Sequence, residues 1–408
     1  MFKGGSRYIF NRRVAKSYYA FVVLVGVGTA FAWSSQLGAC EGRGDLCAVT
    51  KSALEEASRI RGLSVKGSVP CVVRSRQEIE GFLNEAIAEK FPKDTLEMEQ
   101  LVYRAIALVP DDYDYIRGIV TAYVQQIGGY YDPDKKLFVM LDTMPEALQL
   151  PVAVHELTHA LQDQKFNLTK FLEPAKMSND ELMARAALVE GDATAVMQDF
   201  MSSRKHKAPS GQESSTKEAS IPVPPALERV LLFPYIQGLS FTRRILREGG
   251  FAAINEAFLR PPTTSREILH PEQFITRAFI PTALDVKDVE MPMGAGRQIF
   301  SDTVGEFVIS ALIGTALSSQ TRGEGCAQGW KRDRIVVFKS DKDRRLISWM
   351  SEWNSEAEAQ EFSECYREML KARYQKDVQD EFLPVSHAKK MRLQKRGTMV
   401  SIVIEVEQ

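Results

Sequence analysis

The amino-acid sequence predicts an α+β protein, in which a mainly helical domain with a small antiparallel sheet precedes a smaller α+β module. Apolar residues recur at helical spacing through most of residues 51–259. A strand-turn-strand pattern interrupts this spacing at residues 130–141. From about residue 296 onward strand-like alternation becomes frequent, which marks the start of the second module.

Residues 1–39 predict a signal segment, because their charge and hydropathy differ from those of the rest of the chain. The whole chain has a formal net charge of −1, which gives no indication of a nucleic-acid partner. An apolar run at residues 20–33 is shorter than the roughly 18–20 residues of a membrane span, and it fits the core of an export signal. The segment contains basic residues and no acidic ones: Lys3, Arg7, Arg12, Arg13 and Lys16.

The segment ends in Leu37-Gly38-Ala39-Cys40, which resembles the lipobox of bacterial lipoprotein signals. In that signal the cysteine is lipidated and becomes the new N-terminus. The resemblance implies an exported protein on the periplasmic or cell-envelope face, held at the membrane by a lipid on Cys40. An uncleaved signal anchor, or a cleaved signal with Cys40 as an ordinary thiol, are the alternatives.

The other four cysteines are consistent with export, because an even number suits disulfide formation in an oxidising compartment. The two early and the two late residues are the natural pairs, Cys47 with Cys71 and Cys326 with Cys365. Sequence alone does not select among the three connectivities, and four reduced, buried thiols are the alternative.

The first domain is predicted to span residues 40–295 and to begin with helices. Residues 63–73 predict a strand broken by a turn, and Asp132-Pro133-Asp134 predicts the turn of the hairpin at 130–141. The polar segment 202–224 predicts a mobile loop. Helices are predicted at 51–61, 75–90, 95–108, 112–127, 151–164, 179–201 and 225–259.

The C-terminal α+β module is predicted to span residues 296–408. Its predicted elements are a helix across 299–317, strands at 334–340 and 345–353, a charged helix at 355–374 and a final strand at 399–407.

The chemistry of the chain centres on HELTH, residues 155–159. On a helix that starts with Pro151 as its first residue, one side is polar and the other apolar, so the polar side must face water, a cleft or a metal ion. His155 and His159 lie one turn apart and can reach one ion, and Glu156 beside them can take a proton from a water molecule. A solvated helix face with two surface histidines is the alternative.

A catalytic zinc ion needs a third protein ligand, and the next helix offers Glu190. Glu181, Asp192 and Asp199 fall within about 20° of one another and predict a solvated, charged face. Glu190 lies on the opposite, apolar face, where an unpaired carboxylate is costly. A Glu190 that is neutral or paired with a buried arginine is the alternative. No acid can be identified as the partner that metal-bound histidines need at their other ring nitrogen.

HELTH followed by Glu190-Gly191-Asp192-Ala193 resembles the gluzincin metallopeptidases. The resemblance implies a zincin-like fold, zinc held by His155, His159 and Glu190, and Glu156 as the general base. The interval of 31 residues between His159 and Glu190 is longer than usual for that group and requires an insertion between the two helices.

Several phrases together resemble an uncharacterised group of predicted bacterial HExxH metallopeptidases: GGYYDP, HELTHALQDQ, LVEGDAT, SREILHP and GWKRDR. The mechanism implied is hydrolysis of a peptide or protein substrate, which requires a donor to the oxyanion. Tyr131 and His270 are the main candidates, and Tyr130 and Tyr235 are secondary ones. For each of them the alternative is a half-buried packing aromatic or a loop histidine without a catalytic role.

The sequence therefore predicts a membrane-tethered zinc metallopeptidase that acts on the exported side. A non-catalytic exported lipoprotein, which uses a zinc-stabilised scaffold to bind partners in the envelope, is the alternative.

Overall fold

The computed structural model describes residues 45–90, 93–203, 223–340, 344–375, 383–386 and 389–406. The predicted signal segment with Cys40 and most of the predicted loop 202–224 lie outside these residues. Within the described residues, no helix has both the length and the apolarity to cross a membrane.

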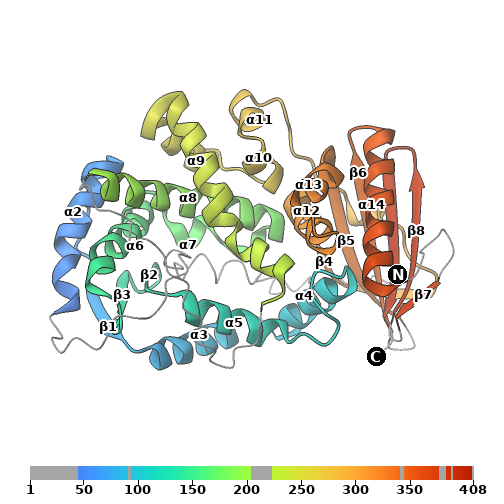
Figure 1. Ribbon diagram of the computed structural model, residues 1–408, viewed down its shortest axis with the longest axis horizontal. Helices are drawn as coiled ribbons and strands as arrows, with labels where there is room; N and C mark the ends of the chain where they lie inside the picture. The colour runs from blue at the N-terminus through green and yellow to red at the C-terminus, as the bar shows by residue number, and fades with distance from the viewer. Residues whose placement is uncertain are drawn as a thin grey trace, which may run out of the picture.

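The first long helix, α2 (Thr50–Arg61), lies at one end of the molecule and the large C-terminal sheet lies at the opposite end, with the next helices along one side between them (Figure 1). Gly62 ends the first long helix, α2, in the left-handed conformation at φ 73°. The strand predicted at 63–73 is limited to β1, Cys71–Arg74. The helices of this region are η1 (Leu46–Val49), α2 (Thr50–Arg61), α3 (Arg76–Lys90), α4 (Lys93–Ala105) and α5 (Tyr115–Gln126).

The predicted hairpin forms β2 (Gly129–Asp132) and β3 (Leu137–Leu141) of a three-stranded sheet. The Asp132 carboxylate accepts hydrogen bonds from the backbone N–H groups of Asp134 and Lys135, both at 3.0 Å, which stabilises the turn. β3 is central, with β2 antiparallel to it and β1 parallel to it. β2 is therefore an edge strand, and it packs against the helix that carries HELTH.

Two long helices pack against each other: α6 (Glu146–Phe166) carries HELTH and α8 (Asn179–Ser203) carries Glu190. Pro151 lies inside α6 rather than at its first position, because the helix already begins after Pro145. The interval between α6 and α8 contains a short helix, α7 (Leu168–Phe171), and a 3₁₀ turn, η2 (Pro174–Lys176).

A third long helix, α9 (Pro225–Leu259), packs closely on α8 and breaks its helical geometry at Gly249 and Gly250. The two backbones touch where glycines face each other: a Cβ atom on Gly191 would lie 2.1 Å from the carbonyl oxygen of Gly238. Neither position can carry a side chain without separating the helices.

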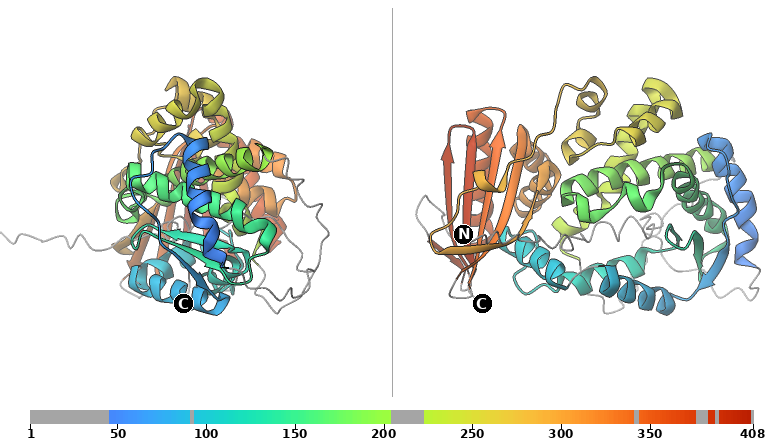
Figure 2. Two further views of the ribbon diagram at one scale, coloured as in Figure 1. Left: turned by 90° about the vertical axis from the view of Figure 1, so that its left-hand side faces the viewer. Right: turned by 180° about the vertical axis from the view of Figure 1, so that it is seen from behind.

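The C-terminal part is built on a six-stranded antiparallel sheet in the order β4-β5-β6-β9-β8-β7. The right-hand view of Figure 2 shows this sheet from behind. Its strands are β4 (Ala295–Asp302), β5 (Trp330–Ser340), β6 (Arg345–Trp353), β7 (Leu383–Ser386), β8 (Lys389–Arg396) and β9 (Met399–Val406). The helices of this part are α10 (Ser265–Leu269), α11 (Pro271–Thr276), the 3₁₀ turn η3 (Val286–Asp288), α12 (Gly305–Ala316), α13 (Gln320–Ala327) and α14 (Glu356–Tyr374).

The helix predicted across 299–317 is wrong in its first third. Residues 295–302 pair with β5 instead, and Gly305 at φ 83° starts α12. The sequence did not reveal β4 because its partner strand lies more than 30 residues further along the chain.

α14 covers one face of the sheet, where the ring of Trp349 in β6 packs on Phe362 at 5.8 Å between centroids. The same buried cluster continues into the first part of the molecule, where Phe233 of α9 meets Phe307 of α12 at 4.2 Å. The predicted α+β class, a helical part followed by a sheet-containing module, is confirmed.

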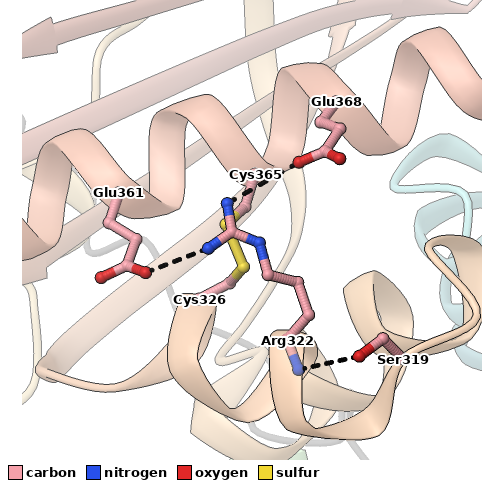
Figure 3. The surroundings of a disulfide bond; sticks show 6 residues. All are labelled: Ser319, Arg322, Cys326, Glu361, Cys365 and Glu368. Carbon is pink, nitrogen blue, oxygen red and sulfur yellow. Dashed lines mark hydrogen bonds and ion pairs between the residues drawn. A yellow bond between two sulfur atoms is a disulfide. The ribbon is translucent and has the colours of Figure 1, made fainter.

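One disulfide joins the two early cysteines, Cys47 and Cys71, and a second disulfide joins the two late ones, Cys326 and Cys365. The second one joins α13 to α14, beside an arginine, Arg322, that lies 3.3 Å from Glu361 and 3.7 Å from Glu368 (Figure 3). Both disulfides are consistent with an oxidising environment.

Candidate metal centre

His155, His159 and Glu190 converge on one point between α6 and α8. The Nε2 atoms of the two histidines are 3.1 Å apart, and Oε2 of Glu190 lies 3.2 Å from His155 Nε2 and 3.3 Å from His159 Nε2. These three atoms form a nearly equilateral triangle, which we call the ligand triangle. In the described part of the chain it is the one group of three metal-ligating side chains close enough to share an ion.

The ligand triangle has the dimensions of a zinc site. Ligand atoms held about 2.0–2.1 Å from a tetrahedral zinc ion are about 3.3–3.4 Å apart. The second carboxylate oxygen of Glu190, Oε1, is buried and has no hydrogen-bond partner among the described residues. Such an atom is costly unless a cation or a donor satisfies it. The three side chains therefore fit a metal ion.

Charge coupling inside the ligand triangle shifts the pKa of each member. Burial tends to raise the pKa of Glu190, but the neighbouring His159 and His155 outweigh burial and hold this pKa at about 2. Burial tends to lower the pKa of His159, but Glu190 raises it to about 9. For His155 burial dominates and lowers the pKa. The carboxylate of Glu190 is thus stabilised in its ionised, metal-binding form.

Glu156 lies beside the ligand triangle and is anchored from the sheet. Its Oε2 accepts a hydrogen bond from the backbone N–H of Tyr131 in β2 at 3.1 Å. Its Oε1 has no hydrogen-bond partner in the described part of the chain. Burial raises the pKa of Glu156 well above its usual value. The arrangement leaves one carboxylate oxygen free to exchange a proton.

The side chains of the site are buried. Glu156, His155 and Glu190 have 0% exposure and His159 has 3%. The polar side of the HELTH helix is therefore packed against α8 and β2, so the alternative of a solvated helix face is wrong.

The prediction of a solvated face for Asp192 is wrong. Asp192 is fully buried, and its carboxylate lies 2.8 Å from Nε of the equally buried Arg61 at the end of α2. The helical wheel placed Asp192 on the side of α8 opposite Glu190. Helix α2 packs against this side of α8, and its Arg61 supplies the positive charge that pairs with Asp192. Glu181 and Asp199 lie near the helix ends and are partly exposed, paired with Arg185 and Arg243.

The sequence does not reveal the residue that contacts Nδ1 of His159. Oε1 of Gln162 lies 2.9 Å from His159 Nδ1, and Nε2 of the same amide lies 2.9 Å from Asp192. The available signal was the spacing, since Gln162 follows His159 by three residues on one helix face.

The side chains of the two main oxyanion candidates, Tyr131 and His270, are hydrogen-bonded to residues outside the ligand triangle. The Tyr131 hydroxyl donates to Asp163 at 2.8 Å, one turn beyond His159. Nε2 of His270 lies 2.7 Å from Glu306 at the start of α12. This region borders the first turn of α8, about 15 Å along the helix from Glu190. An oxyanion role for Tyr131 requires its hydrogen bond to Asp163 to break, whereas one for His270 requires its distance from Glu190 to shorten.

The secondary candidates are buried aromatic residues. Tyr130 stacks on Phe82 with 5.5 Å between ring centroids, and burial raises its pKa above the usual value. Tyr235 lies on α9 and is 7% exposed.

Residues 292–408 match a domain of unknown function (DUF8575). The match covers the six-stranded sheet with α12, α13 and α14, and it does not include HELTH or Glu190. No curated protein and no solved structure matches the chain.

Proposed function

We propose that this protein is a zinc metallopeptidase that hydrolyses peptide bonds, with Glu156 as the general base. The observation that carries the proposal is the state of the Glu156 carboxylate, which has one oxygen anchored by Tyr131 and the other free beside the ligand triangle. A purely structural metal site has no use for such a base and normally closes with a fourth protein ligand.

Zinc is the proposed metal because two histidines and one carboxylate form a donor set typical of catalytic zinc, with the fourth position left open. When bound, zinc supplies Lewis acidity, which acidifies water and polarises a peptide carbonyl. His155, His159 and Glu190 would hold the ion.

The residues of the chain then perform the proton transfers. Glu156 takes a proton from the water that attacks the carbonyl carbon, and it delivers this proton to the amine nitrogen as the C–N bond breaks. Burial raises the pKa of Glu156, and a carboxylate with a raised pKa is a stronger base than an exposed one, which favours the first of these transfers.

The alternative is a non-catalytic scaffold stabilised by zinc, and the burial of the site favours it. All four residues are at most 3% exposed, so a substrate reaches them only after a rearrangement. The enzyme remains the first proposal, because a structural zinc site gives no role to the Glu156 carboxylate beside the ligand triangle.

The test compares zinc content and hydrolysis of a casein and peptide panel between the parent protein and Glu156→Gln. Glu146→Gln, an exposed substitution in the first turn of the same helix, is the matched control. The proposal expects stoichiometric zinc in all three proteins and activity in the parent and control only. Tight zinc binding with no Glu156-dependent hydrolysis would favour the scaffold.

We also propose that the protein is exported and held at the membrane by lipid on Cys40. The two disulfides support an oxidising location. Cys40→Ser should move the protein from the membrane fraction to the soluble fraction. A Cys40→Ser protein that stays in the membrane fraction would favour a signal anchor instead.

A further inference from the structure

Behind His159, a buried side-chain amide is fixed from three directions. Oε1 of Gln162 lies 2.9 Å from His159 Nδ1, while its Nε2 lies 3.0 Å from the carbonyl oxygen of Val189 and 2.9 Å from Oδ2 of Asp192. Gln162 is 0% exposed, so no water competes for these bonds.

These contacts allow one orientation of the amide only. A backbone carbonyl and a carboxylate accept hydrogen bonds and do not donate them, so the amide group that faces both must be the NH₂. The amide oxygen then faces His159 Nδ1 and can only accept. Nδ1 must therefore carry a proton, which leaves the Nε2 lone pair of His159 for a metal ion.

Asp192 is held in turn by a buried arginine from another part of the chain. Nε of Arg61 lies 2.8 Å from Asp192 Oδ2, and Nη2 of Arg61 lies 2.9 Å from Oδ1 of Asn255 in α9. Arg61 is the last residue of α2, and it also lies over the ring of Phe251 at 4.8 Å. The chain of contacts thus ties α6, α8, α2 and α9 together.

The two proposed histidine ligands differ in the hydrogen bonding of Nδ1. Nδ1 of His155 is buried and has no hydrogen-bond partner among the described residues, whereas Nδ1 of His159 has Gln162. His159 is therefore the ligand whose ring orientation and tautomer are set before an ion arrives.

We infer that Gln162, Asp192 and Arg61 form a positioning chain that presents Nε2 of His159 to the metal. The inference rests on the proposed zinc site and extends it beyond the three ligands to residues on other helices. Loss of such an outer partner typically weakens metal binding about 10–100-fold.

The first experiment compares Gln162→Met with Gln164→Met. The Gln164 side chain bonds to Lys66 and Gly67 rather than to the site, so it controls for loss of a glutamine amide on the same helix. Zinc affinity is measured by chelator competition. We expect it to fall about 10–100-fold for Gln162→Met, and to stay within about threefold of the parent for the control.

A second readout observes the proton itself. The chain has five histidines, so ¹⁵N-histidine spectra of the zinc-loaded protein are tractable. The Nδ1–H proton of His159 should be protected from exchange in the parent and the control, and should exchange at least about tenfold faster in Gln162→Met.

A third comparison guards against misfolding. Gln162→Glu places two carboxylates against each other and should weaken zinc binding, whereas Gln162→Glu combined with Asp192→Asn keeps the total charge and an acceptor for Nδ1. We expect the double variant to recover zinc affinity to within about tenfold of the parent, as coupled residues do.

The outcomes separate the inference from the proposed function. If Gln162→Met binds zinc as tightly as the parent with an equally protected Nδ1–H, the positioning chain is wrong while the zinc site stands. If the parent itself binds no zinc, the proposed function fails first. Equal losses in Gln162→Met and Gln164→Met would show general destabilisation and would also overturn the inference.

Discussion

The backbone N–H of Tyr131 donates to Oε2 of Glu156 at 3.1 Å, so the edge strand β2 fixes one half of the carboxylate that lies beside the ligand triangle. The contact joins two segments that are 25 residues apart, and it leaves Oε1 of Glu156 without a partner among the described residues. The strand thereby orients the proposed general base as well as completing the small sheet.

Shortening this side chain should separate anchoring from catalysis. In Glu156→Asp the carboxylate cannot keep the Tyr131 hydrogen bond and also reach the ligand triangle, because it is one methylene shorter. We expect kcat to fall by up to about 10²–10⁴-fold, the range that general-base catalysis provides, with zinc content unchanged. Steady-state peptide hydrolysis and metal analysis measure both, and unaltered kcat would contradict the role of this anchoring.

Removal of the third ligand should release the metal. Glu190→Ala leaves two histidines only, so zinc affinity should fall by more than the about 10–100-fold typical of an outer partner. Glu181→Ala on the same helix, where the side chain pairs with Arg185 near the surface, should bind zinc like the parent. Metal analysis after dialysis decides the matter, and full zinc retention in Glu190→Ala would exclude this ligand.

The glycine after Glu190 should be needed for helix packing. In Gly191→Ala the new methyl group would lie 2.1 Å from the Gly238 carbonyl oxygen, which forces α8 away from α9 and should cost about 1–3 kcal/mol. Gly81→Ala in α3 is the control, because its Cβ meets nothing within 4 Å and should stabilise the helix by about 0.5–1 kcal/mol. Denaturant unfolding compares them, and a neutral Gly191→Ala would show that the helices can separate freely.

Asp302 should give the folded state a measurable pH dependence. It accepts hydrogen bonds from the N–H groups of Asn179 and Thr303, but burial raises its pKa from 3.8 to about 7. Between these values the unfolded carboxyl ionises and the folded one does not, so the free energy of unfolding falls as pH rises from about 4 to 7 and then levels off.

The neutral substitution Asp302→Asn keeps the acceptor oxygen and removes the ionisation. Its free energy of unfolding relative to the parent should therefore improve from pH 5 to pH 8, by on the order of 1 kcal/mol or more. Urea unfolding at both pH values measures the difference. A difference that is independent of pH would show that Asp302 titrates in the folded protein as it does in the unfolded chain.

Local sequence signals predicted well the elements of the half that carries the ligand triangle. The helical spacing around His155 and His159 and the turn at Asp132 each act over a few residues, so the sequence shows them directly. The small apolar residues that share a helix face with Glu190 also predicted that this carboxylate is buried, and it is.

By itself, the sequence determined the two histidines, the general base and the third ligand as candidates, since helix geometry alone sets which side chains share a face. Only the tertiary structure decided that Asp192 is buried and paired, because its partner Arg61 lies 131 residues earlier and a helical wheel contains no neighbouring helix. The same reason applies to Gln162 and Tyr131. Their roles depend on which elements pack against α6, and that packing is set by long-range burial rather than by local periodicity.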